Sequence, residues 1–123
     1  MILGIWRVVA RGLLLPRAAA LLHHGGIGTA AQGLAAGIPQ LVVPFAHDQP
    51  DNADRLEKLG VARWLLPAKF TAANVARELE TLLVDARFKE SATRLAEKLK
   101  SEDGLGAAAD VIERTALANS KPV

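Results

Sequence analysis

Three glycines in four positions constrain this chain more than any other feature. Gly25, Gly26 and Gly28 follow an apolar run, Ala18–Leu22, and two histidines. Glycine has no Cβ and adopts positive φ without penalty, so the cluster predicts a tight turn and close approach of the backbone to another group. Thr29 then opens a stretch of small residues, which predicts a helix start. Free N–H groups and the positive end of the helix dipole meet there, so the turn predicts an anion site, and phosphate is the expected anion.

The two histidines border this turn. An imidazole nitrogen of His24 could donate to a phosphate oxygen, beside backbone and hydroxyl donors of the glycine turn and Thr29. The alternative is that the histidine pair only bonds loop carbonyls, and the glycine turn favours the anion site over it. Alternation along an extended segment directs His23 away from His24, so we expect His23 to be structural.

A second polar motif, Asp48-Gln49, lies in a loop flanked by two prolines. A carboxylate that only accepts, beside an amide that both donates and accepts, suits vicinal hydroxyls such as those of a sugar. The alternative is that Asp48 or Asp51 caps the following helix. Both roles are compatible if Asp51 or Asn52 caps the helix while Asp48 faces a ligand.

Apolar runs and their punctuation by glycine and proline predict alternating strands and helices. We expect strands at Ala18–Leu22, Gln40–Pro44 and Val61–Leu66, and helices at 28–36, 52–59, 71–84, 85–100 and 107–118. This order predicts an α/β fold, the βαβαβ half of a doubly wound parallel sheet with a helical C-terminus. Both polar motifs directly follow a strand, and ligands of such sheets bind beyond the carboxyl ends of the strands.

Composition narrows the functional classes. A chain of 123 residues predicts one domain, and five aromatic residues in a half-apolar chain predict a core of Leu, Ala and Val. The absence of cysteine excludes disulfides and thiolate metal sites, which is consistent with a reducing compartment. A net charge of +2, with mixed signs, lacks the concentrated basic face of a nucleic-acid-binding protein. We predict a soluble cytoplasmic protein and leave a peripheral membrane location open.

Neither a metal nor a hydrolytic nucleophile is expected. His23, His24 and His47 could ligate zinc in principle, but adjacent histidines on an extended segment diverge and Asp48 is the only obvious carboxylate partner. No Ser or Cys stands on a strand-to-helix elbow. We therefore predict no metal and no hydrolytic nucleophile in this chain, and we expect no cofactor.

One long segment, Leu15–Ala62, reads LPRAAALLHHGGIGTAAQGLAAGIPQLVVPFAHDQPDNADRLEKLGVA. It closely resembles the nucleotide-sugar-binding signature of family 1 glycosyltransferases with the GT-B fold. The nearest subgroup is the bacterial macrolide- and rhamnolipid-type transferases and the sterol glucosyltransferases. The resemblance extends over about Leu13–Ala118, which leaves residues 1–12 unmatched and residues 119–123 as an expected frayed tail.

The resemblance implies a nucleotide-diphosphate-sugar as donor substrate and assigns a part of it to each motif. It places the diphosphate at His24, Gly25, Gly26, Gly28 and Thr29, and the sugar hydroxyls at Asp48 and Gln49. Gln32 stands where many members carry a Glu for the ribose, a departure shared by other bacterial and sterol-type members. The implied reaction is hexosyl transfer to a hydroxyl acceptor, and the fold requires no metal.

The resemblance also implies what this chain lacks. A full GT-B transferase has two Rossmann-like domains, and its catalytic base lies in the N-terminal one. The matched part corresponds to a truncated C-terminal domain, so we expect a donor-binding fragment with little or no activity alone. The alternatives are a non-catalytic or regulatory subunit that pairs with a separate N-terminal GT-B chain, and a decayed gene fragment that still folds. We expect the edge at Ala18–Leu22 to be covered by Met1–Val9 or to form a dimer.

Overall fold

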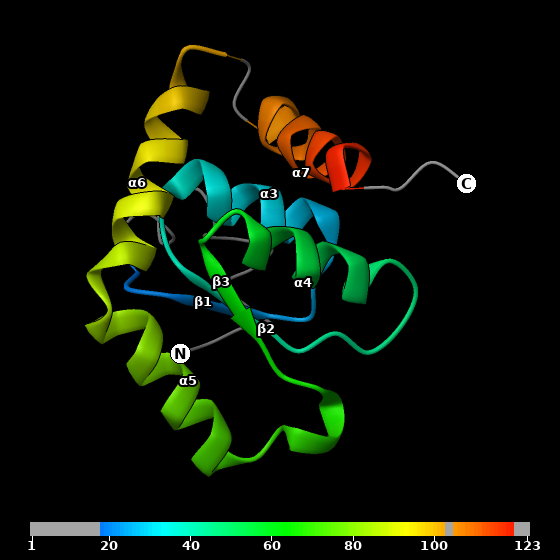
Figure 1. Cartoon of the computed structure of the whole chain (residues 1–123), viewed down its shortest axis with the longest axis vertical. Coiled ribbons are helices and arrows are strands. Elements are labelled where there is room, and N and C mark those ends of the chain that lie inside the picture. Colours follow the sequence, from blue (N-terminus) through cyan, green and yellow to red (C-terminus); the bar gives the residue numbers. More distant parts are fainter. Residues whose placement is uncertain (1–17, 103–104, 120–123) are drawn as a thin grey trace.

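The computed structural model describes residues 18–102 and 105–119 (Figure 1). Its strands are β1 (Leu21–His23), β2 (Gln40–Val42) and β3 (Ala62–Trp64). Its α-helices are α3 (Ile27–Ala36), α4 (Gln49–Lys58), α5 (Ala72–Val84), α6 (Ala86–Lys100) and α7 (Leu105–Asn119). A short 3₁₀ helix, η2 (Pro67–Lys69), follows β3. The calls on residues 1–12 and on the tail beyond Asn119 lie outside the described residues.

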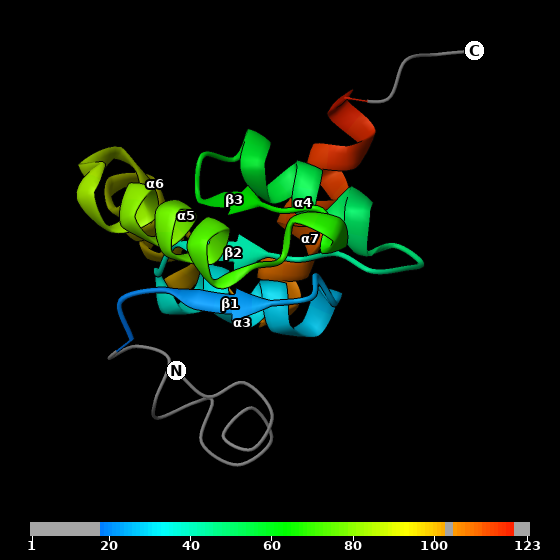
Figure 2. The ribbon, with the colours of Figure 1, turned by 90° about the horizontal axis from the view of Figure 1, so that it is seen from below.

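The three strands form a parallel sheet in the order β1-β2-β3, which confirms the predicted βαβαβ arrangement. Helix α5 lies on one face of the sheet, and α3, α4 and α7 lie on the other (Figure 1). All three strands point the same way, so the β1–α3 and β2–α4 connections meet at one edge (Figure 2). This is the edge at which a ligand was predicted to bind.

Period-two alternation of the strand side chains builds a core on each face. Leu22 and Leu41 pack with Leu82 of α5 on one face. Val42 packs among the helices of the other face, where Leu34 and Leu56 are buried. Because both faces are covered, the strands are apolar almost throughout, as expected for a parallel sheet.

All predicted elements are present, but the strands are shorter than predicted. Strand β2 ends at Val42 rather than Pro44, and β3 spans Ala62–Trp64 rather than Val61–Leu66. Gly37 ends α3 with φ 72°, and Thr71 caps α5 by accepting from the backbone of Asn74, both as predicted. The first strand is Leu21–His23 rather than Ala18–Leu22. Leu21 N–H bonds Pro39 O, just before β2 begins. The residues before Pro39 belong to the end of α3, so they do not form a strand that could pair with residues 18–20.

Two helices begin earlier than predicted. Helix α4 begins at Gln49 rather than Asn52, because Pro50 is well suited to the first turn of a helix. Helix α7 begins at Leu105 rather than Ala107. No helix in the two described ranges is long and apolar enough to cross a membrane.

Candidate functional site

The glycine turn packs directly against the start of α4. Gly25 has φ +101°, a conformation that L side chains rarely adopt. A Cβ at this position would lie 2.9 Å from the backbone oxygen of Gln49 and 3.1 Å from Cγ1 of Val42. Only glycine therefore allows the turn to come this close to the second loop.

His23 supports the turn from beneath. The residue is 8% exposed, its Nδ1 accepts from Gly25 N–H at 3.0 Å, and its Nε2 lies 2.6 Å from Oε1 of Gln40. Because Nδ1 accepts, the proton resides on Nε2 and is donated to Gln40. Burial lowers the pKa of His23 to about 4; the hydrogen bond to Gln40 opposes this shift and the charge of His24 adds to it. His23 is thus a neutral structural residue, as the alternation predicted.

His24 differs from His23 in its hydrogen bonding. Its Nδ1 is buried and makes no hydrogen bond, and no other side-chain nitrogen or oxygen in the described ranges is buried without a partner. Its ring lies over the turn, since a Cβ on Gly26 would be 3.0 Å from its Cε1. Buried polar atoms are normally bonded, so an unpaired one at a ligand edge marks a candidate contact.

The start of α3 lies beside His24. Gly26 is the N-cap residue and offers no side-chain cap to the helix. A Cβ on Gly28 would meet no atom within 4 Å, so this part of the first turn faces open space. Thr29 is buried in the same turn. A group that accepts hydrogen bonds can therefore approach the backbone of this helix start closely.

The loop after β2 is braced by Gln49. Its Oε1 accepts from the backbone N–H of Phe45 at 2.9 Å and of Ala46 at 3.1 Å. Two N–H donors on one atom identify that atom as the oxygen, so Nε2 remains as a donating group. Between these residues His47 adopts φ 59°, a strained conformation for a residue with a side chain.

Asp48 occupies the N-cap position of α4 but makes no side-chain cap bond. Its Oδ2 instead lies 3.4 Å from Nδ2 of Asn52. The prediction that Asp51 or Asn52 caps the helix is therefore wrong, because α4 starts earlier and both residues lie inside it. Nδ2 of Asn52 also donates to the carbonyl of Gly25 over 2.8 Å, which ties the two loops together.

Sequence reasoning missed the site's two supporting amides, Gln40 and Asn52. Gln40 is fully buried, and its Nε2 donates to Ala30 O at 3.2 Å, which anchors α3 to β2. The available signal was a polar residue at the start of an apolar strand run; in the sheet Gln40 is paired with Leu21, two positions before His23 on the neighbouring strand. For Asn52 the signal was its place four residues after Asp48, a spacing that brings side chains together on a helix.

Two predictions remain, the ribose contact of Gln32 and the absence of a metal site. Gln32 is half-buried in α3, one turn after Gly28, and its ribose contact stays a prediction. In the part of the chain that the structure describes, no three His, Cys, Asp or Glu side chains group as a metal site would require.

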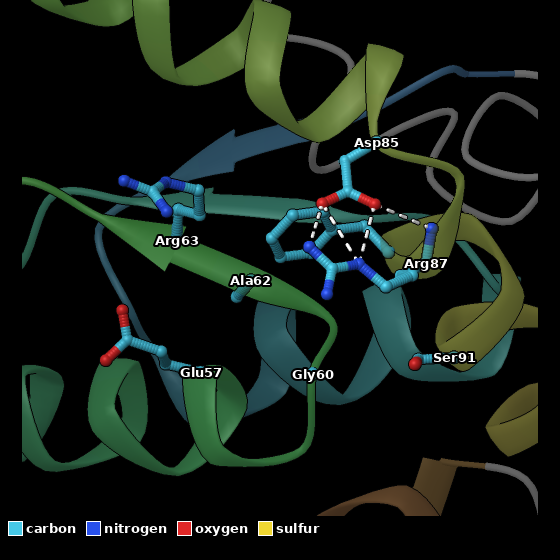
Figure 3. Close-up of a pocket in the computed structure, with 8 residues that line it drawn as sticks. Glu57, Gly60, Ala62, Arg63, Asp85, Arg87 and Ser91 are labelled. Atoms are coloured by element: carbon cyan, nitrogen blue, oxygen red, sulfur yellow. Dashed lines mark hydrogen bonds and ion pairs between the residues drawn. The ribbon is translucent and has the colours of Figure 1, made fainter.

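A pocket of about 320 Å³ lies beside the start of β3, at the amino end of that strand (Figure 3). It is lined by Glu57, Gly60, Ala62, Arg63, Asp85, Arg87, Phe88 and Ser91. Arg87 bonds Asp85 at 2.7 Å and lowers the pKa of that carboxyl to about 2, while Arg63 pairs with Glu78. Since both arginines are paired with carboxylates, we assign this pocket no ligand.

A parallel sheet with a glycine turn and a helix start at its carboxyl edge defines a Rossmann-like domain. Comparison with known proteins identifies its family. Residues 5–114 match the family of the erythromycin biosynthesis protein CIII-like C-terminal domain, and the chain belongs to this family of GT-B glycosyltransferases. The match reaches into residues 1–12, which the sequence resemblance had left unaligned.

Individual relatives are transferases. The chain is 38% identical over 104 residues to the O-mycaminosyltylonolide 6-deoxyallosyltransferase of Streptomyces fradiae, covering 84% of this chain and 25% of that protein. It is also 38% identical over 95 residues to a sterol 3-beta-glucosyltransferase of Arabidopsis thaliana, covering 77% of this chain and 15% of that protein. The chain thus spans a quarter or less of the length of these relatives.

Solved structures show the same fold. The glycotransferase of kitacinnamycin superposes with a TM-score of 0.71 at 34% identity, over 87% of this chain and 28% of that one. The glycosyltransferase VinC, solved in complex with DTDP, gives a TM-score of 0.68 at 30% identity, over 85% of this chain and 27% of that one.

Proposed function

We propose that this chain binds a nucleotide-diphosphate-sugar and forms the donor-binding part of a glycosyltransferase. The diphosphate would lie at His24, Gly25, Gly26, Gly28 and Thr29, and the sugar at Asp48 and Gln49. The observation that carries the proposal is the buried, unpaired Nδ1 of His24 beside the uncapped start of α3. The DTDP bound by VinC and the transferases among the relatives support it.

The proposed chemistry relies on hydrogen bonds and the helix dipole. Diphosphate oxygens would accept from the imidazole of His24 and from backbone N–H groups at the start of α3, where the dipole favours negative charge. Gly28 leaves the room for that approach. These donors stabilise the diphosphate charge without a metal ion, which we propose is not required.

The second loop would recognise the sugar. The carboxylate of Asp48 accepts from one hydroxyl, while Nε2 of Gln49 donates to the oxygen of another. The internal bonds of Gln49 fix the direction of that donor, since Oε1 is held by the backbone of Phe45 and Ala46. The pair would thus read two hydroxyls with opposite hydrogen-bonding roles.

Transfer to an acceptor needs more than this site. A base must take the proton of the acceptor hydroxyl. The chain spans a quarter or less of its relatives, so we propose that the base comes from a further GT-B domain, on the same or a separate chain. In the described ranges β1 pairs only with β2, and we propose that its other edge pairs with a second copy in a dimer.

Isothermal titration calorimetry with UDP and dTDP tests this proposal. We expect at least one nucleotide to bind, and His24→Ala to weaken it about tenfold through loss of a charge-assisted hydrogen bond. His47→Asn is the matched control, because His47 is exposed and Asn tolerates its φ of 59°. Absence of binding by both nucleotides would overturn the proposal.

A further inference from the structure

Asn52 is a polar side chain in the interior of the domain. It lies in the first turn of α4 and is 1% exposed. Burying an amide costs free energy unless its donors are bonded. The single NH₂ group of Asn52 makes two directed contacts, to Gly25 O at 2.8 Å and to Oδ2 of Asp48 at 3.4 Å. An apolar residue could fill this space, so packing alone does not explain an amide here.

The two contacts reach the two halves of the proposed donor site. Gly25 belongs to the glycine turn after β1, and Asp48 belongs to the loop after β2. The loops also touch directly, since the Cα of Gly25 faces the backbone oxygen of Gln49. Asn52 lies behind this junction and is bonded to both loops.

The planar geometry of the amide makes these bonds interdependent. One NH₂ group carries both hydrogens in a fixed plane, so a shift of the Gly25 carbonyl alters the bond to Asp48. The first bond helps to hold Gly25 at φ +101°, which orients the N–H groups that follow it. The second occupies Oδ2 of Asp48 and leaves Oδ1 for another partner.

We propose that Asn52 is a positioning residue that couples the diphosphate loop to the sugar loop. Ordering of the glycine turn by a diphosphate is transmitted through the amide of Asn52 and fixes Asp48 for the sugar. This inference rests on the proposed function, and it adds a residue that would not itself touch the donor.

The test is nuclear magnetic resonance of the full chain, titrated with UDP and dTDP, which carry no transferable sugar. In the wild type we expect the amides of Gly25–Thr29 and of Phe45–Asp48 to shift together, along with the side-chain NH₂ of Asn52. In Asn52→Ala the amides of Gly25–Thr29 still shift, at about tenfold weaker affinity, while those of Phe45–Asp48 no longer respond. Asn52→Asp keeps the shape of the side chain and gives the same loss.

A matched control is Asn74→Ala. Nδ2 of Asn74 also donates to a backbone carbonyl, that of Lys69, at 2.8 Å, but in the first turns of α5. Its removal deletes the same kind of bond in a part of the chain with no proposed ligand contact. We expect it to leave both the nucleotide affinity and the paired shifts unchanged.

Three outcomes would overturn the inference. Equal responses of Phe45–Asp48 in wild type and Asn52→Ala would overturn it while the proposed function stands. If neither nucleotide shifts Gly25–Thr29 in the wild type, the proposed function falls and the coupling falls with it. If both Asn52 variants fail to fold, the wild-type NH₂ signal decides, and its failure to move on nucleotide binding contradicts the coupling.

Discussion

Gly28 and Gly33 lie in the same helix, α3, but differ in the space around them. A Cβ on Gly33 would lie 2.5 Å from the amide of Gln40, whereas a Cβ on Gly28 would meet nothing within 4 Å. Gly33 thus leaves room for the side-chain amide of Gln40, which donates to Ala30 O. Gly28 is dispensable for the fold, and its absent side chain matters only if a ligand approaches it.

This contrast predicts opposite phenotypes for two alanine substitutions. Gly28→Ala should leave thermal stability unchanged or raise it by up to about 1 kcal/mol, because alanine favours helix, while it weakens nucleotide binding. Gly33→Ala should destabilise the fold by about 1–3 kcal/mol through overpacking against Gln40. Thermal unfolding and calorimetry measure both effects. Full nucleotide affinity in Gly28→Ala would contradict close approach of the diphosphate to this turn.

His23 predicts a dependence of stability on pH. Its pKa falls from 6.5 to about 4 on folding because of burial, so between these values the unfolded chain binds more protons than the folded one. The contribution of His23 to the free energy of unfolding is therefore complete above pH 6.5. It is lost as the pH falls toward 4, which lowers the free energy of unfolding by up to about 3 kcal/mol.

Urea unfolding between pH 7 and pH 4 measures this effect. His23→Gln is the control, since it removes the titrating ring and should flatten the profile in that window. Identical pH profiles for the wild type and His23→Gln would contradict the structural role assigned to this neutral ring.

At the scale of elements, the loop between β2 and α4 depends on one side chain. Gln49 holds the loop in place through Oε1, which leaves Nε2 to donate elsewhere. Two substitutions separate these roles. A glutamate can accept from the same two N–H groups but has no donor, whereas an alanine can do neither.

We therefore expect the backbone amides of Phe45 and Ala46 to keep their wild-type chemical shifts in Gln49→Glu. The same variant should lose the gain in affinity that a UDP-sugar shows over UDP. Gln49→Ala should lose both, because the loop is no longer braced. Amide spectra and calorimetry with UDP and UDP-glucose measure these effects. An undiminished sugar gain in Gln49→Glu would contradict the assignment of Nε2 to a hydroxyl.

The helix and strand order could be predicted from apolar runs and glycine punctuation, as Gly37 and Thr71 illustrate. The start of α4 could not, because prolines on either side of Asp48-Gln49 favour a loop as much as a helix start. The links made by Gln40 and Asn52 could not be predicted either, since they join residues 10 and 27 positions apart along the chain. Such contacts are set by the packing of the whole sheet.

At the scale of the whole molecule, we propose that this site is the donor-binding part of a larger transferase. The described residues bring the glycine turn and the Asp48 loop to one edge of the sheet (Figure 2). The chain spans a quarter or less of its transferase relatives. On the proposed function, this edge binds the donor, and the activation of an acceptor requires groups outside this site.

This division predicts that the isolated chain transfers little or no sugar. Incubation with UDP- and dTDP-sugars and generic hydroxyl acceptors, followed by mass spectrometry of the products, should show no glycoside above background. Nucleotide binding measured on the same sample controls for folding. Robust transfer by the chain alone would contradict the proposal that acceptor activation needs groups outside this chain, and it would require a catalytic base within the chain.

The most direct test of donor binding is an amide-shift titration of the wild-type chain with UDP, dTDP and their sugars. We predict that a nucleotide diphosphate shifts the signals of Gly25–Thr29, and that its sugar conjugate produces a further change at Asp48 and Gln49. Absence of any shift at Gly25–Thr29 with all four ligands would contradict the donor site and leave only the fold.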